Sequence, residues 1–293
     1  MKKQLLTSLF AFLLVFSLCM GCSKAETGDK TTASDSFEVS SQKTSPVKIT
    51  LNEVAHSVFY APLYVAIEKG YFKDENIDLT LVTGFGADKT MTAVISGEAD
   101  IGFMGSEASV YMYSEGASDY VVNFAQLTQR AGNFLVARQD NEHFQWADLK
   151  GKTVLGGRKG GMPEMVFEYI LKENGIDPEK DLTIIQNIDF GSTAPAFADG
   201  RGDFTIEFEP GATSLESEGK GHVIASLGKD SGYVPYTAFS AKKSYLKENP
   251  DVIQRFTNAL QKGMDYVRSH SPSETASVIK PQFPETTLEM ITT

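Results

Sequence analysis

Catalysis by a nucleophile or a bound metal requires side chains such as cysteine, serine and histidine in suitable arrangements, and this sequence has few candidates. Both of its cysteines, Cys19 and Cys22, precede residue 23, so the rest of the chain has no thiol to act as a nucleophile or a metal ligand. No serine lies in a nucleophile-elbow motif, and no Ser-His-Asp arrangement is indicated. The histidines show no metal-ligand spacing: His56, His143, His222 and His270. We therefore expect no catalytic centre, no metal ion and no cofactor.

A glycine-rich segment, Gly157-Arg158-Lys159-Gly160-Gly161, could contact phosphate or another anion. It lacks the Gly-x4-Gly-Lys-Ser/Thr pattern of a nucleotide-binding P-loop. With a helix N-terminus behind it, Arg158 and Lys159 could hold an anionic ligand group, or both cations could simply belong to a solvated loop. The segment therefore predicts a candidate binding loop that includes Arg158, Gly160 and Met162, and not a nucleotidase.

Aromatic rings and carboxylates cluster in segments that should be loops. Flat rings facing each other across a cleft would sandwich a planar ligand. The candidate rings are Phe59, Tyr60, Phe85, Phe190, Tyr233 and Tyr236. Phe59 and Phe85 could instead be core residues. Glu107, Glu207 and Glu209 would repel a sulfonate or nitrate but would accept hydrogen bonds from an amino-substituted heterocycle. His56 is either a further ligand contact or an ordinary loop residue.

The elements that must position these residues repeat once along the chain. An ungapped shift of 103 residues brings Asp78-Leu79-Thr80-Leu81-Val82 onto Asp181-Leu182-Thr183-Ile184-Ile185. The same shift places Gly97 and Asp100 on Gly200 and Asp203. Arg201-Gly202-Asp203 imitates a cell-adhesion tripeptide, but it falls on the same turn as Glu98-Ala99-Asp100, so a structural role accounts for it.

Each copy predicts strands that alternate with helices. In the first copy we expect strands over residues 47–54, 79–82, 101–104 and 120–125. We expect helices over residues 61–69 and 89–96, and a third from Ser106, as its N-cap, to residue 115. Such alternation implies an α/β protein whose two lobes each contain a mainly parallel sheet covered by helices. Helices over residues 244–249 and 252–267 should pack back on the first lobe.

Two further strands, over residues 134–137 and 237–241, are the expected crossing points between the lobes. The predicted division assigns residues 47–136 and 238–293 to the first lobe and residues 137–237 to the second. In open α/β sheets, ligands bind at the carboxyl ends of the strands. The cleft between the lobes is therefore the expected binding site, and its loops add Ser106 and Gln126 to the candidate contacts.

Three segments resemble one family of transport proteins. Residues 61–72 (Ala61-Pro62-Leu63-Tyr64 to Gly70-Tyr71-Phe72), 97–102 and 148–152 are similar to the substrate-binding proteins of ABC importers, in the branch that serves alkanesulfonate, taurine, nitrate and thiamine-pyrimidine uptake. The resemblance implies a type II periplasmic-binding-protein fold that delivers solute to a membrane permease and its ATPase. It also implies that further helices of the first lobe would follow Thr293.

Together, these patterns predict a monomeric solute-binding receptor and not an enzyme. The cleft carboxylates and rings favour a planar nitrogen heterocycle that resembles a thiamine-pyrimidine precursor. An alkanesulfonate, taurine or nitrate-type anion is the alternative ligand. A pyrimidine-synthase-like enzyme on the same fold and a sensor that presents its ligand to a membrane kinase are the alternative functions.

The first residues predict export and attachment to lipid. Lys2 and Lys3 precede an apolar run over residues 5–18, which is shorter than the roughly 20 residues of a membrane-spanning helix and fits a signal peptide over residues 1–21. Cys19-Met20-Gly21-Cys22 resembles a bacterial lipobox, with Cys22 as the residue that would carry palmitate; a plain secretory signal is the alternative. Residues 22–46 are polar and should form a flexible tether. We expect anchoring at the extracytoplasmic face of the bacterial cell membrane.

The charge balance restricts the partners. The formal charge is −11, from 27 basic and 38 acidic residues, and removal of Lys2 and Lys3 with the signal peptide makes it −13. Nucleic-acid surfaces are matched by clustered Lys and Arg, so we expect no nucleic-acid partner. The same excess of negative charge disfavours a strongly anionic ligand.

Overall fold

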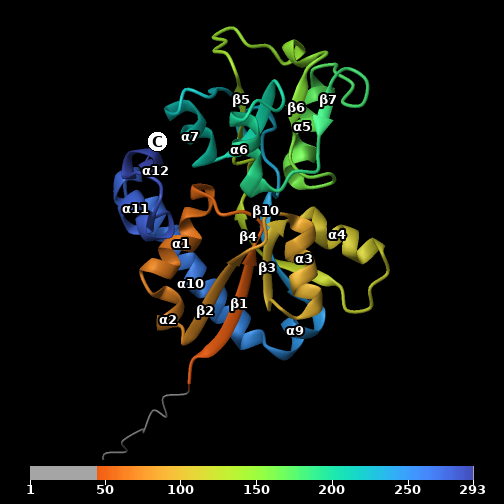
Figure 1. The fold of residues 1–293 in the computed structure, drawn as a ribbon. Coiled ribbons are helices and arrows are strands. Elements are labelled where there is room, and N and C mark those ends of the chain that lie inside the picture. Colours follow the sequence, from red (N-terminus) through yellow and green to blue (C-terminus); the bar gives the residue numbers. More distant parts are fainter. Residues whose placement is uncertain (1–44, 293) are drawn as a thin grey trace, which may run out of the picture. The chain divides into compact units, whose positions relative to one another are not determined.

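The structure is a computed structural model that describes residues 45–292. The predicted signal peptide, Cys22 and nearly all of the predicted tether lie outside these residues. The described part contains two five-stranded sheets flanked by helices, as expected for two α/β lobes (Figure 1). Between residues 45 and 292, no helix is both long and apolar enough to cross a membrane.

The first sheet is parallel except for one strand. In spatial order it contains β2 (Ile77–Thr83), β1 (Val47–Glu53), β3 (Ile101–Gly105), β10 (Thr237–Lys242) and β4 (Val121–Thr128). β10 runs antiparallel to both of its neighbours, with Phe239 opposite Phe103 in β3. We call this sheet and the helices packed on it the first lobe.

The second sheet has the same order and the same exception. It contains β7 (Thr183–Ile185), β6 (Thr153–Leu155), β8 (Phe204–Phe208), β5 (Asn133–Ala137) and β9 (His222–Ser226). β5 is antiparallel to β8 and β9, in the position that β10 occupies in the first sheet. We call this sheet and its helices the second lobe.

The two sheets reproduce the 103-residue repeat in atomic detail. In the first lobe, the Asp100 carboxylate accepts a hydrogen bond from the Thr50 backbone N–H, at 2.8 Å. In the second lobe, the Asp203 carboxylate accepts one from the Thr153 N–H at the same distance. Each aspartate ties the turn before one strand to the backbone of the neighbouring strand, at Thr50 in β1 and at Thr153 in β6. Asp203 of the Arg-Gly-Asp tripeptide therefore has a structural role.

The chain crosses between the lobes just before each antiparallel strand. β5 is paired with the second sheet over its whole length, so the crossing lies in residues 129–132, and the expected boundary after residue 136 falls inside this strand. The return crossing lies in residues 231–236, before β10. Because each lobe takes its antiparallel strand from chain that has just crossed, both connections stay short.

Most helices lie in the first lobe. They are α1 (Ala61–Glu68), α2 (Tyr71–Asp74), α3 (Ala87–Ser96), α4 (Glu107–Ser114), α9 (Lys243–Glu248), α10 (Pro250–Ser269), α11 (Pro272–Ile279) and α12 (Leu288–Thr292). The second lobe has α5 (Met162–Glu173), α6 (Thr193–Ala198), α7 (Gly211–Ser217) and α8 (Leu227–Asp230). The 3-10 turns are η1 (Val58–Tyr60), η2 (Trp146–Leu149), η3 (Phe190–Ser192) and η4 (Lys280–Gln282).

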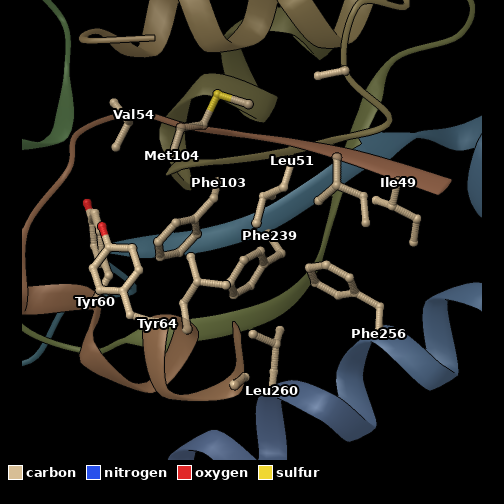
Figure 2. Close-up of a cluster of buried hydrophobic side chains, with 14 of the residues drawn as sticks. Ile49, Leu51, Val54, Tyr60, Tyr64, Phe103, Met104, Phe239, Phe256 and Leu260 are labelled. Atoms are coloured by element: carbon tan, nitrogen blue, oxygen red, sulfur yellow. The ribbon is translucent and has the colours of Figure 1, made fainter. Parts of the chain in front are cut away.

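An aromatic core holds the first lobe together on one face of its sheet. Phe103 of β3 stacks on Phe239 of β10, with ring centroids 4.2 Å apart, and Phe256 of α10 meets Phe239 edge-on (Figure 2). Tyr60 closes the cluster beside Phe103, at the end of the strand that faces the binding site. The core that stabilises the lobe thus also fixes the position of a site residue.

Helix α10 approaches α1 so closely that only glycine fits at their crossing. A Cβ on Gly263 would lie 2.1 Å from the backbone oxygen of Pro62, which cannot move without shifting α1. Gly263→Ala should lower the free energy of unfolding by about 1–2 kcal/mol, because overpacking outweighs the gain in helix propensity. Urea unfolding would measure it, with Gln261→Ala, exposed on the same helix, as the control. A Gly263→Ala protein as stable as the wild type would contradict this packing.

Candidate functional site

A cavity of about 550 Å³ lies at the carboxyl ends of the parallel strands and is lined by both lobes. The first lobe contributes Val54 and Gly105, where β1 and β3 end, together with one face of α4. The second lobe contributes residues 158–163, which comprise the end of the loop after β6 and the first two residues of α5, and Phe208 at the end of β8. A volume of this size holds a small organic molecule.

Glu107, the first residue of α4, reaches across the cavity to the other lobe. Its Oε1 accepts a hydrogen bond from the backbone N–H of Met162, at 2.8 Å, and Met162 is the first residue of α5. Its Oε2 is buried and makes no hydrogen bond within the described residues. Burial raises the pKa of Glu107 to about 7, against the opposing effects of its own backbone N–H and of the Met162 N–H. The carboxyl therefore has one oxygen without a hydrogen-bond partner.

Tyr236 presents a second polar atom that lacks a partner. Its side chain is 2% exposed and lines the cavity, yet its hydroxyl makes no hydrogen bond within residues 45–292. A buried hydroxyl without a partner costs roughly 1–3 kcal/mol. Burial raises the pKa of Tyr236 well above its ordinary value, so the hydroxyl stays neutral and can donate or accept. A bound molecule that bonded Tyr236 and Glu107 would remove both penalties.

Aromatic and apolar side chains make up much of the remaining wall. Tyr60 lies in the first lobe, and Phe190 and Phe208 lie in the second, where their rings meet edge-on with centroids 5.9 Å apart. Tyr111 of α4 joins the lobes at the rim, because its hydroxyl lies 3.3 Å from the sulfur of Met165 in α5. Rings beside a few polar atoms suit a flat ligand with polar edges.

Four charged residues bridge the lobes beside the cavity; we call them the interlobe ion-pair cluster. Asp88 and Lys89 begin α3 of the first lobe, and Arg158 and Asp189 belong to the second. The Arg158 guanidinium pairs with Asp88 across the gap and with Asp189 at 2.6 Å, and the Lys89 ammonium lies 2.7 Å from Asp189. Lys89 and then Arg158 hold the pKa of Asp189 below its usual value. Two carboxylates thus compensate the charge of Arg158, which makes it a poor partner for an anionic ligand.

Removal of Arg158 should weaken closure of the lobes. Arg158→Ala deletes the contact with Asp88, and ion pairs of this exposure contribute up to about 1 kcal/mol, or a factor of about five in the closure equilibrium. Small-angle scattering should show a larger radius of gyration without ligand. Lys150→Ala, which breaks an ion pair with Asp181 inside the second lobe, is the matched control. Equal radii for the two variants would contradict a bridging role for Arg158.

The structure brings about half of the predicted contacts to the cavity. Those that line it are Tyr60, Glu107, Arg158, Gly160, Met162, Phe190 and Tyr236. Gly160, with φ of +73°, turns the chain at the mouth, and its N–H donates to Glu164. Burial and the neighbouring Glu168 carboxyl raise the pKa of Glu164 to about 7.

His56 does not line the cavity. Its ring is bonded to the Glu53 carboxylate, at 2.7 Å, and to the backbone oxygen of Gln282, at 2.8 Å. It also packs against Tyr64 and Phe283. These contacts fasten the C-terminal segment to β1, so His56 has a structural role in this conformation.

Four other predicted contacts support the hinge and the loops without lining the cavity. Phe59 packs between Phe208 and Tyr236, which is the core alternative considered for it. The Phe85 side chain is 41% exposed, and its backbone oxygen accepts a hydrogen bond from the Phe190 N–H. The Ser106 side chain does not cap α4, since its hydroxyl donates to the Pro235 oxygen, and Gln126 donates to the Thr128 oxygen.

The remaining three predicted contacts also point elsewhere. Glu207 is buried in the second lobe, where it accepts from the hydroxyls of Thr193 and Thr205. Glu209 accepts from the Thr213 N–H at the start of α7. Tyr233 is 73% exposed and lies under the guanidinium of Arg130. Glu207 is turned away because β8 runs to Phe208, past the expected start of the loop.

Several residues that line the cavity were not predicted. They include Met91, Tyr111, Met112, Gln186, Asn187 and Phe208. One signal could have found Tyr111: Glu107, Tyr111 and Glu115 are spaced four apart, which puts them on the same face of a helix. Gln186 and Asn187 follow a strand of only three residues, too short to mark its end in the sequence. The part of the chain that the structure describes has no cluster of three or more potential metal ligands.

These observations define a two-lobed α/β binding protein with its site between the lobes, and comparison with known structures supports the fold. The alkanesulfonate-binding protein SsuA from Xanthomonas axonopodis pv. citri, bound to MOPS, superposes with a TM-score of 0.71 at 16% identity, over 84% of this chain and 82% of that one. The periplasmic nitrate-binding protein NrtA from Synechocystis PCC 6803 superposes with a TM-score of 0.70, also at 16% identity, over 84% of this chain and 69% of that one. The protein therefore has the periplasmic-binding-protein fold.

The chain belongs to the NMT1/THI5-like family, whose model matches residues 58–274. It is 52% identical over 252 residues to YtlA of Bacillus subtilis, which carries a binding-protein name, covering 86% of this chain and 75% of that one. It is also 23% identical over 232 residues to the 4-amino-5-hydroxymethyl-2-methylpyrimidine phosphate synthase of Candida albicans, covering 72% of this chain but only 64% of the synthase.

Proposed function

We propose that the protein is the extracytoplasmic solute-binding receptor of an ABC importer, which captures a small planar nitrogen heterocycle and delivers it to a permease and its ATPase. The observation that carries this proposal is the cavity of about 550 Å³ that both lobes line. A ligand bound there would touch both lobes and so favour the closed state. The 52% identity to a protein with a binding-protein name supports binding over catalysis.

Three features of the cavity favour the heterocycle over an anion. Glu107 offers an acceptor oxygen, and Tyr236 offers a neutral hydroxyl. The aromatic rings of Phe190 and Phe208 could cover a flat ring system. The charge of Arg158 is compensated by Asp88 and Asp189. A solute with N–H donors at the edge of an aromatic ring matches all three features.

A thermal-shift screen of aminopyrimidines, flavins, sulfonates, taurine and nitrate tests the proposed function. We expect aminopyrimidines to raise the melting temperature by several degrees, because a ligand at a hundred times its Kd increases the free energy of unfolding by about 2.7 kcal/mol. Recovery of the solute unchanged after incubation would exclude turnover. Stabilisation by sulfonates alone would overturn the ligand class, and conversion of the solute to a product would overturn the receptor.

Lipid attachment through Cys22 is part of the same proposal. Metabolic labelling with a radioactive fatty acid should mark the wild-type protein, and Cys22→Ala should carry no label, because the lipobox directs modification to the thiol of its last cysteine. Cys19→Ala is the matched control and should keep the label. Label on Cys22→Ala would contradict anchoring at this residue.

A further inference from the structure

The contact between Glu107 and α5 places a carboxylate of the first lobe on a helix N-terminus of the second. Helix α5 has twelve residues, and its N-cap, Gly161, provides no side-chain cap. Such an end attracts an anion, because its first N–H groups are unpaired and the helix dipole is positive there. The protein fills this position itself, with Oε1 of Glu107 at 2.8 Å from the Met162 N–H.

The second oxygen of the same carboxyl is buried in the wall of the cavity. Glu107 is 8% exposed, and Oε2 has no hydrogen-bond partner among the described residues. Tyr236, 2% exposed, adds an unpartnered hydroxyl to the lining of the same cavity. Two buried polar atoms without partners in one cavity indicate a ligand that bonds to them.

We propose that Glu107 determines the charge class of the ligand: its carboxyl occupies the α5 N-terminus where a ligand anion would otherwise bind, and its second oxygen accepts an N–H of a neutral or cationic ligand. This inference rests on the proposed receptor function and adds the residue that selects the solute. Ionised, the carboxyl repels an anion. Protonated, it still fills the helix end.

The surrounding charges are consistent with this assignment. The cationic side chains that line the cavity are Arg158 and Lys159, and Arg158 is held by Asp88 and Asp189. Glu115, the C-cap of α4 about two turns after Glu107, adds another carboxylate to the same lining. With Glu107 in place, an oxyanion in the cavity would lie near the carboxylates of Glu107 and Glu115 and near the guanidinium of Arg158, whose charge is already compensated. Without Glu107, the α5 N-terminus and Lys159 would be free to bind the anion.

The test compares anion binding by Glu107→Ala and Glu107→Gln with wild type, using methanesulfonate and nitrate as probes in isothermal titration calorimetry. Both variants should bind methanesulfonate more tightly than wild type. Glu107→Ala should gain at least tenfold because it vacates the helix end, and Glu107→Gln should gain less because its amide still fills the helix end and removes only the charge. Glu107→Gln should also lose at least tenfold in affinity for an aminopyrimidine, since its amide NH2 replaces an acceptor with a donor. Glu107→Gln is nearly isosteric and covers the case in which the alanine variant fails to fold. Glu98→Gln, exposed and outside the cavity, should match wild type.

The outcomes separate this inference from the receptor function. If the wild-type protein binds methanesulfonate tightly with Glu107 intact, the receptor stands and the role of Glu107 is overturned. If neither variant gains anion affinity, the inference is overturned whatever the natural ligand is. If the wild-type protein binds none of the solutes in the screen and the variants still gain anion affinity, the helix-end role stands and the receptor proposal fails.

Discussion

Glu207→Gln should stabilise the protein by about 2 kcal/mol at pH 8 and leave its stability at pH 4.5 nearly unchanged. Burial raises the pKa of this carboxyl from 4.5 to about 7, against the hydroxyls of Thr205 and Thr193, which lower it. When the pKa of a carboxyl is higher in the folded state than in the unfolded state, the protein becomes less stable as the pH rises from the unfolded pKa through the folded pKa. Glutamine cannot ionise, and both threonine hydroxyls can rotate to pair with its amide.

Urea unfolding between pH 4.5 and pH 8 measures this effect. Wild-type stability should fall across the range, with Glu107 and Glu164 contributing in the same direction because burial raises their pKa values to about 7 as well. The Glu207→Gln curve should fall less steeply. Glu218→Gln, at an exposed position after α7, should follow the wild-type curve. Identical slopes for wild type and Glu207→Gln would show that Glu207 does not titrate in this range.

Phe239→Ala should lower the free energy of unfolding by about 4 kcal/mol, the largest effect that we expect from a single substitution. The Phe239 side chain is completely buried between Phe103 and Phe256 (Figure 2). Truncation of such a ring removes its burial and leaves a cavity, which together cost 3–5 kcal/mol. β10 carries this ring into the first sheet directly after the return crossing.

An exposed aromatic provides the comparison. Tyr113→Ala, at a position 64% exposed on α4, should change stability by less than about 0.5 kcal/mol in the same urea titration. A loss below about 1 kcal/mol for Phe239→Ala would mean that the aromatic core relaxes around the deletion. It would contradict the packing seen in the first lobe.

The sequence repeat predicted much of the fold because its matches lie at structural turns. Asp100 and Asp203 accept the same hydrogen bond in the two lobes, which explains why both fit a single offset. The mainly parallel sheets and the return of the chain to the first lobe are confirmed. The sequence predicts that the chain crosses between the lobes twice, but not that β5 and β10 each insert as the antiparallel strand of a sheet. Strand pairing between distant segments leaves no local pattern.

The site was less predictable than the fold. Glu107 was selected as a carboxylate that would face the ligand, but its bond to Met162 depends on how the two lobes meet, and no local pattern contains that geometry. His56 is a case that the sequence leaves open. A lone histidine in a cleft loop is either a ligand contact or an ordinary loop residue, and here the buried Glu53 and the returning C-terminal segment bind its ring.

A crystal structure of the protein with the solute that stabilises it most would test the central claim most directly. The account predicts electron density for one molecule in the cavity between the lobes, with an N–H of the ligand within about 3.2 Å of the Glu107 carboxyl and its ring against Phe190 or Phe208. Tyr236 should bond to the same molecule. Ligand density outside this cavity, or a ligand anion at the Met162 N–H with Glu107 displaced, would contradict the account.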